Sequence, residues 1–299
     1  MQDIYVLVSE ISAEWVKTAE QYADKANIVF ITRAELKESG CSARYLITTG
    51  LSKEELAKLP DLKTVCAPKT GTDGFPAALM LEKDIKLISS HANAFYVAEH
   101  AVALAFSLLR NIALLNQKFR NSEDTMTFTG MKTMKNMTVG IMGYGNIGST
   151  IAEMLKPYDV TVAAYSHTLP EGVIRCETIK ELFEKADIVF NCLPLTDKTE
   201  GLVKYDELIL FKDKYLVNVS RAEIIGEEDL FRILKENVLA GYAADVWYKG
   251  DYRFGNHEYE QFDKVIITPH CGPNVEGGRL RYMEDALNKC LAEMEADER

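Results

Sequence analysis

The chain has 299 residues, of which 47% are hydrophobic and 26% are charged, and its formal net charge is −11. This is an ordinary composition for a soluble protein, and the length is sufficient for two domains. Because the chain is acidic and has no run of Lys and Arg and no basic helix, we expect neither nucleic acid nor a membrane surface as a partner.

Six cysteines are scattered along the chain without a C-x-x-C spacing, and several stand in strand-like segments. This pattern predicts reduced core residues of a cytoplasmic protein rather than disulfides or metal ligands, so no metal site is expected. Residues 1–8 are too short and, at Asp3, too charged for a signal peptide, and no apolar run approaches transmembrane length.

The first 90 or so residues alternate between strand-like and helix-like segments. The helical patterns cover residues 12–25 and 52–58, and the second begins with a capping-box signature from Ser52 to Glu55. The alternation predicts an α/β domain with a parallel sheet and helices on both faces. The predicted strands are residues 4–8, 27–31, 45–49, 64–67 and 85–89.

A loop at residues 68–74 follows the predicted strand 64–67. It therefore lies at the carboxyl end of a parallel strand, where open α/β sheets bind ligands. Lys69 and the backbone N–H groups of the loop could hold a carboxylate. An ordinary strand-to-helix turn is the alternative, and the loop taken alone favours it.

A long helical pattern at residues 97–115 is apolar over much of its circumference, which predicts a buried helix. Glu99 and His100 fall within it, and we interpret both as structural. Residues 121–135 are polar and without periodicity, and are expected to connect this helix to the next domain.

Three glycines at residues 143, 145 and 148 form G-x-G-x-x-G between an apolar strand-like run and an amphipathic segment. A second strand-like run follows at residues 160–165. In this order Gly143 permits a tight turn, Gly145 lets the backbone approach a diphosphate, and Gly148 lets the helix pack close to the strand. The pattern predicts a dinucleotide site at the N-terminus of a helix.

The end of the second strand carries Ser166, His167 and Thr168 instead of the acid that binds the ribose of NAD. An acid would repel a 2′-phosphate, whereas these three side chains can donate hydrogen bonds to one. The sequence therefore favours NADP modestly over NAD. The preference is only modest because no Arg or Lys stands in this loop, and a plain polar turn with NAD bound is the alternative.

Polar residues follow three later strand-like segments: Arg221 follows 214–220, Asp245 ends 240–246, and His270 follows 265–269. The carboxyl ends of parallel strands share one edge of a sheet, where the coenzyme is expected. An Arg offers two parallel donors to a carboxylate, and a His can transfer a proton near neutral pH. Together with a nicotinamide, these groups suffice to interconvert a 2-keto acid and a 2-hydroxy acid.

Seven stretches, in this order, resemble the D-isomer-specific 2-hydroxyacid dehydrogenase family over nearly the whole chain. They are GTD at 71–73, NAFYVAEHAVALAFSLLR at 93–110, VGIMGYGNIG at 139–148, NCLPLTDKTEGLV at 191–203, LVNVSRAEII at 216–225, AGYAADVW at 240–247 and TPHCG at 268–272. The resemblance implies a Rossmann coenzyme domain, residues 93–270, inserted into a smaller flavodoxin-like α/β catalytic domain, residues 1–92 plus 271–299. It also implies a hinge near Asn93 and His270 and a homodimer.

In the family pattern Arg221 matches the substrate-binding arginine and His270 the acid/base. The resemblance implies that backbone N–H groups around Thr70 and Gly71 share the substrate carboxylate and that Asn93 lies at the hinge. Together with Lys69 of the same loop, these are the predicted substrate-binding residues. The expected coenzyme contacts are Gly143, Gly145, Asn146, Ile147, Gly148, Ser166, His167, Thr168, Cys192, Pro194, Thr199, Val219 and Asp245.

The chain departs from the family at two positions. Ala222 stands where a glycine is usual, which looks tolerable. The family's glutamate, which orients the histidine, would fall at Gly250; Asp251 or Glu258 could replace it, but spacing does not place either beside His270. Because reduction needs a protonated His270, we expect kcat/KM to fall above roughly neutral pH if no carboxylate supports it.

The sequence thus predicts an NAD(P)-dependent oxidoreductase that interconverts a small 2-keto acid and a D-2-hydroxy acid. The alternative is an NAD(P)-binding sensor or co-regulator on the same scaffold with little turnover, which the missing glutamate favours and the presence of Arg221 and His270 disfavours. Formate oxidation is a second enzyme alternative. The substrate side chain stays open among glycerate or hydroxypyruvate, glyoxylate, lactate or pyruvate, and phosphoglycerate.

Overall fold

The computed structural model describes residues 2–123, 125, 128–248 and 258–298. The chain folds into two units, which we call the terminal unit and the inserted unit. The terminal unit combines Met1–Asn93 with Asn274–Arg299, and the inserted unit is Ala94–Pro273. The sequence places the boundaries at 92/93 and 270/271. In both divisions the two chain ends share one domain and the other domain lies between them.

The terminal unit is built on a five-stranded parallel sheet with the order β2-β1-β3-β4-β5. This is the strand order of flavodoxin-like folds, as predicted. The strands are β1 (Asp3–Val8), β2 (Asn27–Thr32), β3 (Tyr45–Ile47), β4 (Thr64–Ala67) and β5 (Lys86–Ser89).

Helices cover both faces of this sheet, each through its apolar side. The long α11 (Gly278–Asp297) buries Met283 and Leu287 against Ile4 and Ile47, so the two ends of the chain share one core. Trp15 of α1 (Ala13–Glu20) packs onto the same core. The opposite face is covered by α2 (Arg33–Ser39), α3 (Lys53–Leu56) and α4 (Ala77–Glu82).

The inserted unit contains a seven-stranded parallel sheet with the order β12-β11-β10-β9-β6-β7-β8. The strand order reverses at β6, so the loops after β6 and β9 lie at the switch point where doubly wound sheets bind dinucleotides. This confirms the predicted Rossmann fold. The strands are β6 (Thr138–Met142), β7 (Thr161–Tyr165), β8 (Ile174–Arg175), β9 (Ile188–Asn191), β10 (Tyr215–Asn218), β11 (Gly241–Ala244) and β12 (Val265–Ile267).

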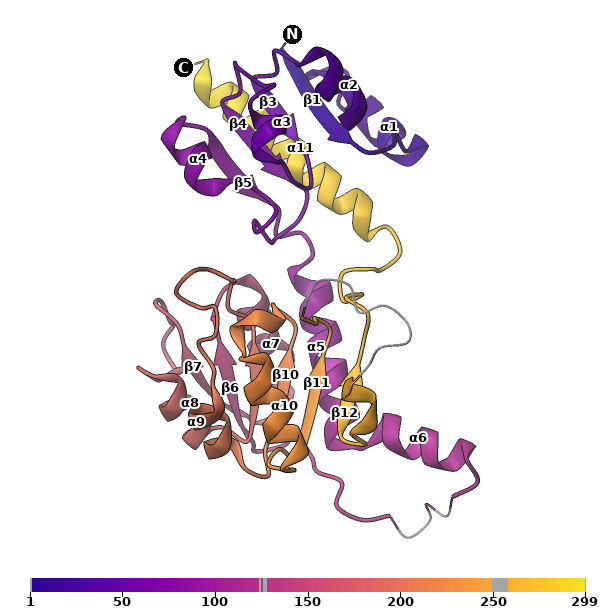
Figure 1. Ribbon diagram of the computed structural model, residues 1–299, viewed down its shortest axis with the longest axis vertical. Coiled ribbons are helices and arrows are strands. Elements are labelled where there is room, and N and C mark those ends of the chain that lie inside the picture. The colour runs from indigo at the N-terminus through magenta and orange to yellow at the C-terminus, as the bar shows by residue number, and fades with distance from the viewer. Residues whose placement is uncertain (1, 124, 126–127, 249–257, 299) are drawn as a thin grey trace. The chain divides into compact units, whose positions relative to one another are not determined.

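The seven-stranded sheet lies between two layers of helices (Figure 1). On one face, α5 (Ala94–Leu109) and α7 (Asn146–Leu155) pack on residues such as Ile141 and Phe190. On the other face, residues such as Val189 and Leu216 contact α8 (Ile179–Lys185), α9 (Tyr205–Leu208) and α10 (Glu227–Lys235). The described part of the inserted unit also contains four short 3-10 helices, η1 (Lys156–Tyr158), η2 (Ile209–Phe211), η3 (Ala222–Ile224) and η4 (Glu258–Gln261).

The single helix predicted at residues 97–115 is wrong: the structure has two helices there. Asn111 adopts a left-handed conformation with φ 51°, which ends α5 and starts α6 (Ile112–Arg120) at a bend of 59°. Side chains of α5 enter the core, whereas none on α6 is buried. No single described helix is long and apolar enough to cross a membrane, although α5 and α6 taken together meet that criterion.

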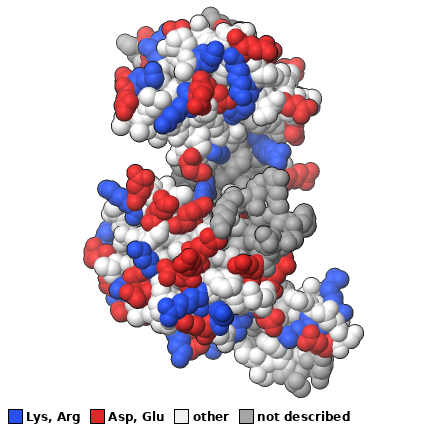
Figure 2. All heavy atoms as spheres, in the orientation of Figure 1, with Lys and Arg blue, Asp and Glu red and all other residues white. Residues whose placement is uncertain are grey.

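Charged side chains of both signs are interspersed over the face of the molecule shown in Figure 2. Among the described residues visible there, no broad basic area stands out, in keeping with the net charge of −11. Any anionic ligand must therefore be held by individual cationic groups and N–H groups rather than by the overall field.

Candidate coenzyme and active site

The glycine-rich loop after β6 needs glycine at two of its positions for steric reasons. Gly143 has φ 90°, and a Cβ there would lie 2.9 Å from the backbone oxygen of Cys192. At Gly148 a Cβ would lie 2.8 Å from Cγ2 of Ile141 and would also meet the carbonyl oxygen of Gly143. The loop and the first turn of α7 are therefore pressed against β6 and the segment after β9.

Gly145 has the opposite surroundings, because a Cβ there would meet no atom within 4 Å. The N–H groups of Gly145, Asn146 and Ile147 donate to no protein acceptor among the described residues, and the first α7 bond runs from Ser149 N to Gly145 O at 2.9 Å. The loop therefore presents an open backbone and the positive end of a ten-residue helix. These features fit the diphosphate of a dinucleotide, the group that the fold implies.

Two buried asparagines hold the loops that follow β9 and β10. The side chain of Asn191 donates to Asn218 Oδ1 at 3.1 Å and accepts from Leu193 N at 3.3 Å. Asn218 in turn donates to the carbonyl oxygen of Arg221 at 3.2 Å and accepts from Ser220 N at 3.2 Å. Both asparagines are fully buried, so this amide network fixes the backbone that leads to Arg221.

Arg221 itself is half-buried and extended, with φ −138°, immediately before η3. Its Nη1 donates to Ser220 O at 2.8 Å. A guanidinium has five N–H donors in a planar fork, a geometry that matches the two oxygens of a carboxylate. The location at the carboxyl end of β10 agrees with the sequence prediction.

Asp245, at the end of β11, is the centre of the polar contacts beyond β11 and β12. Its Oδ1 accepts from Thr268 Oγ1 at 2.6 Å and from Cys271 N at 2.9 Å, and its Oδ2 accepts from Gly272 N at 2.8 Å. The Nε2 atom of His100 lies 3.5 Å from Oδ1 and 3.1 Å from the Thr268 hydroxyl. The carboxylate predicted to contact the coenzyme is thus bound to protein groups on both oxygens.

The ionised form of Asp245 is strongly favoured. Burial alone would raise its pKa, because the residue is only 3% exposed. The hydrogen bonds from His100, Thr268 and the two backbone N–H groups outweigh that effect and lower the pKa to about 2. A buried anion therefore organises the segment from Thr268 to Gly272.

His270 lies in the middle of this segment and has φ 55°. The left-handed region is uncommon for a residue with a side chain and costs about 1–3 kcal/mol. Asp245 binds the N–H groups of the two residues that follow His270, and Trp247 Nε1 donates to Thr268 O at 2.9 Å on the other side. These contacts stabilise the uncommon backbone conformation of His270, whose side chain is exposed.

His100, Asp245 and Cys271 each place a potential metal-ligand atom within 4.8 Å of the others. The Asp245 oxygens already accept three hydrogen bonds from protein donors. Burial and the neighbouring carboxylate raise the pKa of the Cys271 thiol, which favours its neutral form. We therefore interpret the cluster as a hydrogen-bonded support for the His270 segment.

This support is not evident from the sequence. The helical pattern indicates a structural role for His100, but its partners Asp245 and Thr268 lie far away in the sequence. The only sequence signal was the repeated occurrence of polar residues at strand ends. Which strand ends meet a given helix depends on the order of strands in the sheet.

The other predicted coenzyme residues lie in loops at the same edge of the seven-stranded sheet. Ser166 is half-buried after β7, whereas His167 and Thr168 are exposed. Beyond β9, the hydroxyl of Thr199 donates to the carbonyl oxygen of Pro194 at 2.6 Å and so closes the loop. Val219, after β10, is buried.

Cys192 follows β9 at the switch point, and its thiol is strongly desolvated. This desolvation raises the pKa of the thiol to about 12. The side chain is therefore a neutral thiol at physiological pH and not a nucleophile.

In the terminal unit, Thr70 and Asn93 are brought together. The Thr70 hydroxyl lies 2.5 Å from Asn93 Oδ1 and 3.0 Å from Ser90 O. The N–H groups of Thr70 and Gly71 donate to no acceptor within the described ranges. The ammonium of Lys69 stands 5.4 Å from the centroid of the Phe75 ring. The loop after β4 thus offers two unengaged N–H groups beside a cation.

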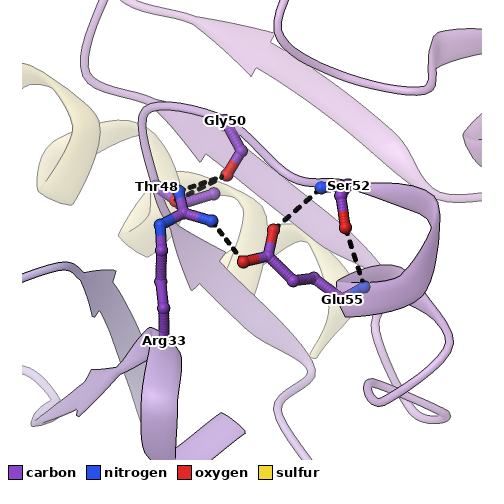
Figure 3. Close-up of polar contacts among 5 residues, drawn as sticks. All are labelled: Arg33, Thr48, Gly50, Ser52 and Glu55. Carbon is purple, nitrogen blue, oxygen red and sulfur yellow. Dashed lines mark hydrogen bonds and ion pairs between the residues drawn. The ribbon is translucent and has the colours of Figure 1, made fainter. Parts of the chain in front are cut away.

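A second polar network ties together the ends of β2 and β3 in the same unit (Figure 3). Arg33 Nη1 pairs with Glu55 Oε1 at 2.5 Å, and Nη2 donates to Gly50 O at 2.9 Å. Glu55 also accepts from Ser52 N at 2.8 Å, and its own N–H donates to the Ser52 hydroxyl, which confirms the predicted capping box. The network borders a cavity of about 550 Å³ lined by Arg33, Lys37, Gly50, Leu51, Ser52, Glu54, Glu55 and Gly74.

Within the described part of the chain, no carboxylate side chain forms a hydrogen bond or ion pair with His270. Gly250 and Asp251 lie outside the described residues. Glu258 is exposed at the start of η4, and no hydrogen bond or ion pair joins it to His270 in the described part of the chain. Asp245 is the carboxylate that supports the His270 segment, and it does so through backbone N–H groups.

These features define a class: an α/β protein with a dinucleotide-binding domain inserted into a flavodoxin-like domain. Residues 102–272 match the family model described as "D-isomer specific 2-hydroxyacid dehydrogenase, NAD binding domain". The chain belongs to this family, as the resemblance in its sequence implied.

Individual relatives agree with the family. The chain is 26% identical over 286 residues to a D-3-phosphoglycerate dehydrogenase of Methanocaldococcus jannaschii, and the match covers 91% of this chain but only 54% of the relative. Identity to a glyoxylate reductase of Thermofilum pendens is 27%, covering 84% of this chain and 78% of the relative. A solved Pyrococcus horikoshii protein superimposes with a TM-score of 0.85 at 26% identity, covering 97% of this chain and 91% of the other.

Proposed function

We propose that this protein catalyses the reduction of a small 2-keto acid to a D-2-hydroxy acid, and the reverse reaction, with a nicotinamide dinucleotide. The observation that carries the proposal is that three features follow strands of one parallel sheet and so share its carboxyl edge. These features are the open loop at Gly145, Arg221, and His270 with its stabilised left-handed backbone. Relatives named glyoxylate reductase and D-3-phosphoglycerate dehydrogenase support this substrate class.

In the proposed mechanism the coenzyme, when bound, supplies or accepts the hydride. Arg221 binds the substrate carboxylate through its guanidinium fork. His270 holds a proton on its imidazole and delivers it to the ketone oxygen, and in the reverse direction it removes the hydroxyl proton. Asp245 stays ionised and keeps the His270 backbone in place. The N–H groups of Thr70 and Gly71, with Lys69, are further proposed carboxylate ligands, and Asn93 orients Thr70.

We propose NADP as the preferred coenzyme, because Ser166, His167 and Thr168 stand where NAD-binding proteins place an acid. We also propose that the protein is a cytoplasmic homodimer. The six cysteines are free thiols, which suits a reducing compartment. The α6 helix buries no side chain and exposes Ile112 and Phe119, at 56% and 72%, which makes it the proposed dimer surface.

The test is oxidation of NADPH and NADH in parallel with a panel of small 2-keto acids. We expect turnover with at least one of them. The Arg221→Ala variant should lose about 100-fold or more in kcat/KM, because a charged, two-pronged contact is removed, while coenzyme affinity stays within about twofold. Arg232→Ala, on α10, is the matched control and should behave like the parent. Tight coenzyme binding without any turnover would instead favour a nucleotide sensor.

A further inference from the structure

A cation from a neighbouring strand, Arg175, lies against the loop at residues 166–168, which is predicted to bind the adenosine ribose of the coenzyme. Arg175 belongs to β8, which pairs with β7 in parallel through Ala164 and Arg175. Its Nη1 donates to Ser166 O at 3.0 Å, and its Nη2 lies 3.5 Å from His167 O. The guanidinium therefore hydrogen-bonds to the backbone carbonyl groups of the two residues that follow β7.

The charge of Arg175 is not neutralised by a neighbouring acid. Among the described residues, no carboxylate forms an ion pair with it, although the chain as a whole has a net charge of −11. The residue is exposed, and two of its five N–H donors are used on carbonyl groups. The remaining donors are available to an acceptor in solvent.

The side chains of the same loop are also unengaged. Ser166, His167 and Thr168 make no side-chain hydrogen bond within the described ranges, and all three carry donors. A cation with free N–H groups, next to donor side chains and without an acid, is suited to a doubly charged phosphate. In a Rossmann fold this position faces the 2′ oxygen of the adenosine ribose.

We propose that Arg175 is the residue that recognises the 2′-phosphate of NADP, assisted by Ser166 and Thr168. The proposal rests on the proposed coenzyme function and adds the residue that sets the coenzyme's phosphate specificity. The guanidinium acts both as a direct ligand of the phosphate and as a support for the loop. The loop sequence alone does not reveal this cation, because Arg175 lies in the next strand rather than in the loop.

The test uses two adenosine probes that lack nicotinamide, so it needs no turnover. Adenosine 2′,5′-bisphosphate and adenosine 5′-monophosphate are titrated into the whole protein by calorimetry. We expect the bisphosphate to bind more tightly, and Arg175→Gln to weaken it about 10- to 100-fold, the usual contribution of charge-assisted bonds. Binding of the monophosphate should change by less than about twofold.

Two further variants separate recognition from loop structure. Arg175→Lys keeps the charge but not the planar fork, so we expect a partial recovery of bisphosphate affinity. Arg232→Gln removes another exposed arginine of the same unit, paired with Glu236 at 2.8 Å, and should change neither affinity. Added salt should reduce the preference of the parent for the bisphosphate.

Equal affinity of the parent for both probes would overturn the proposal. So would an equal loss of both affinities in Arg175→Gln, because Arg175 would then serve only the loop. If the protein reduces no keto acid but shows the Arg175-dependent preference, the proposed reaction fails and this inference stands. The kcat/KM ratio for NADPH over NADH gives an independent readout in an active protein.

Discussion

Replacement of Asp245 by Asn tests how the catalytic segment is held. The change keeps the shape of the side chain but removes its charge and one acceptor. Asp245 Oδ2 accepts from Gly272 N, and Oδ1 from Cys271 N and Thr268. An amide can present only one oxygen to these donors, so at least one buried N–H group loses its acceptor.

The magnitude follows from the pKa of Asp245. Its hydrogen bonds lower the pKa from 3.8 to about 2, and each pKa unit corresponds to 1.36 kcal/mol. Ionised Asp245 therefore contributes about 2 kcal/mol to the stability of the inserted unit. Because the folded pKa is the lower one, this contribution is complete above pH 3.8 and is lost as the pH falls through about 2.

Urea unfolding followed by tryptophan fluorescence measures this loss. The chain has two tryptophans, Trp15 in the terminal unit and Trp247 in the inserted unit. A Trp15→Phe background therefore reports on the inserted unit. We expect Asp245→Asn to lower the free energy of unfolding by about 2–3 kcal/mol at pH 7. The deficit should shrink as the pH falls from 3.8 towards about 2, because Asp245 becomes protonated first in the unfolded chain and then in the folded protein.

The same variant should impair turnover, because His270 is no longer held. Loss of placement by about 1 Å can cost 100-fold in rate, so we expect kcat to fall about 10- to 100-fold with coenzyme affinity retained. Asp187→Asn is the control, since this exposed carboxylate accepts a single backbone bond from Thr138 N at 2.8 Å. An Asp245→Asn protein as stable and as active as the parent would show that Asp245 does not hold the His270 segment.

Three other changes have definite expected outcomes. Gly145→Ala should leave stability unchanged, because the added Cβ contacts no protein atom, but it should weaken coenzyme binding at least tenfold by occupying the space proposed for the diphosphate. Gly148→Ala should instead destabilise the unit by about 1–3 kcal/mol through overpacking. A coenzyme titration and a thermal melt of each variant distinguish the two effects. Arg33→Met should destabilise the terminal unit by about 1–3 kcal/mol, because the Glu55 side chain, only 7% exposed, loses its cation. Urea unfolding followed by Trp15 fluorescence measures this change, and an unchanged unfolding midpoint would contradict it. Phe119→Asp should convert a dimer to a monomer in light scattering, and a parent that is itself monomeric would rule out the proposed dimer surface on α6.

Local sequence patterns were enough to predict those parts of the protein that depend on neighbouring residues. Strand and helix periodicity predicted the two parallel sheets, and the spacing of Gly143, Gly145 and Gly148 predicted the turn whose steric limits the structure displays. The capping box at Ser52 was also predictable, because its partners are three residues apart. The break at Asn111 was not, since a single residue with positive φ leaves the apolar pattern of the helix intact.

Contacts between groups far apart in the sequence could not be predicted and are seen in the folded protein alone. Strand-end positions indicated Arg221, Asp245 and His270, but the role of Asp245 became visible only when His100 and the backbone after His270 were found around it. Arg175 likewise reaches the loop after β7 because β8 is its neighbour in the sheet, and a two-residue exposed strand has no periodicity to detect. Local periodicity is encoded in adjacent residues, whereas these contacts depend on strand order, which links segments far apart in the chain.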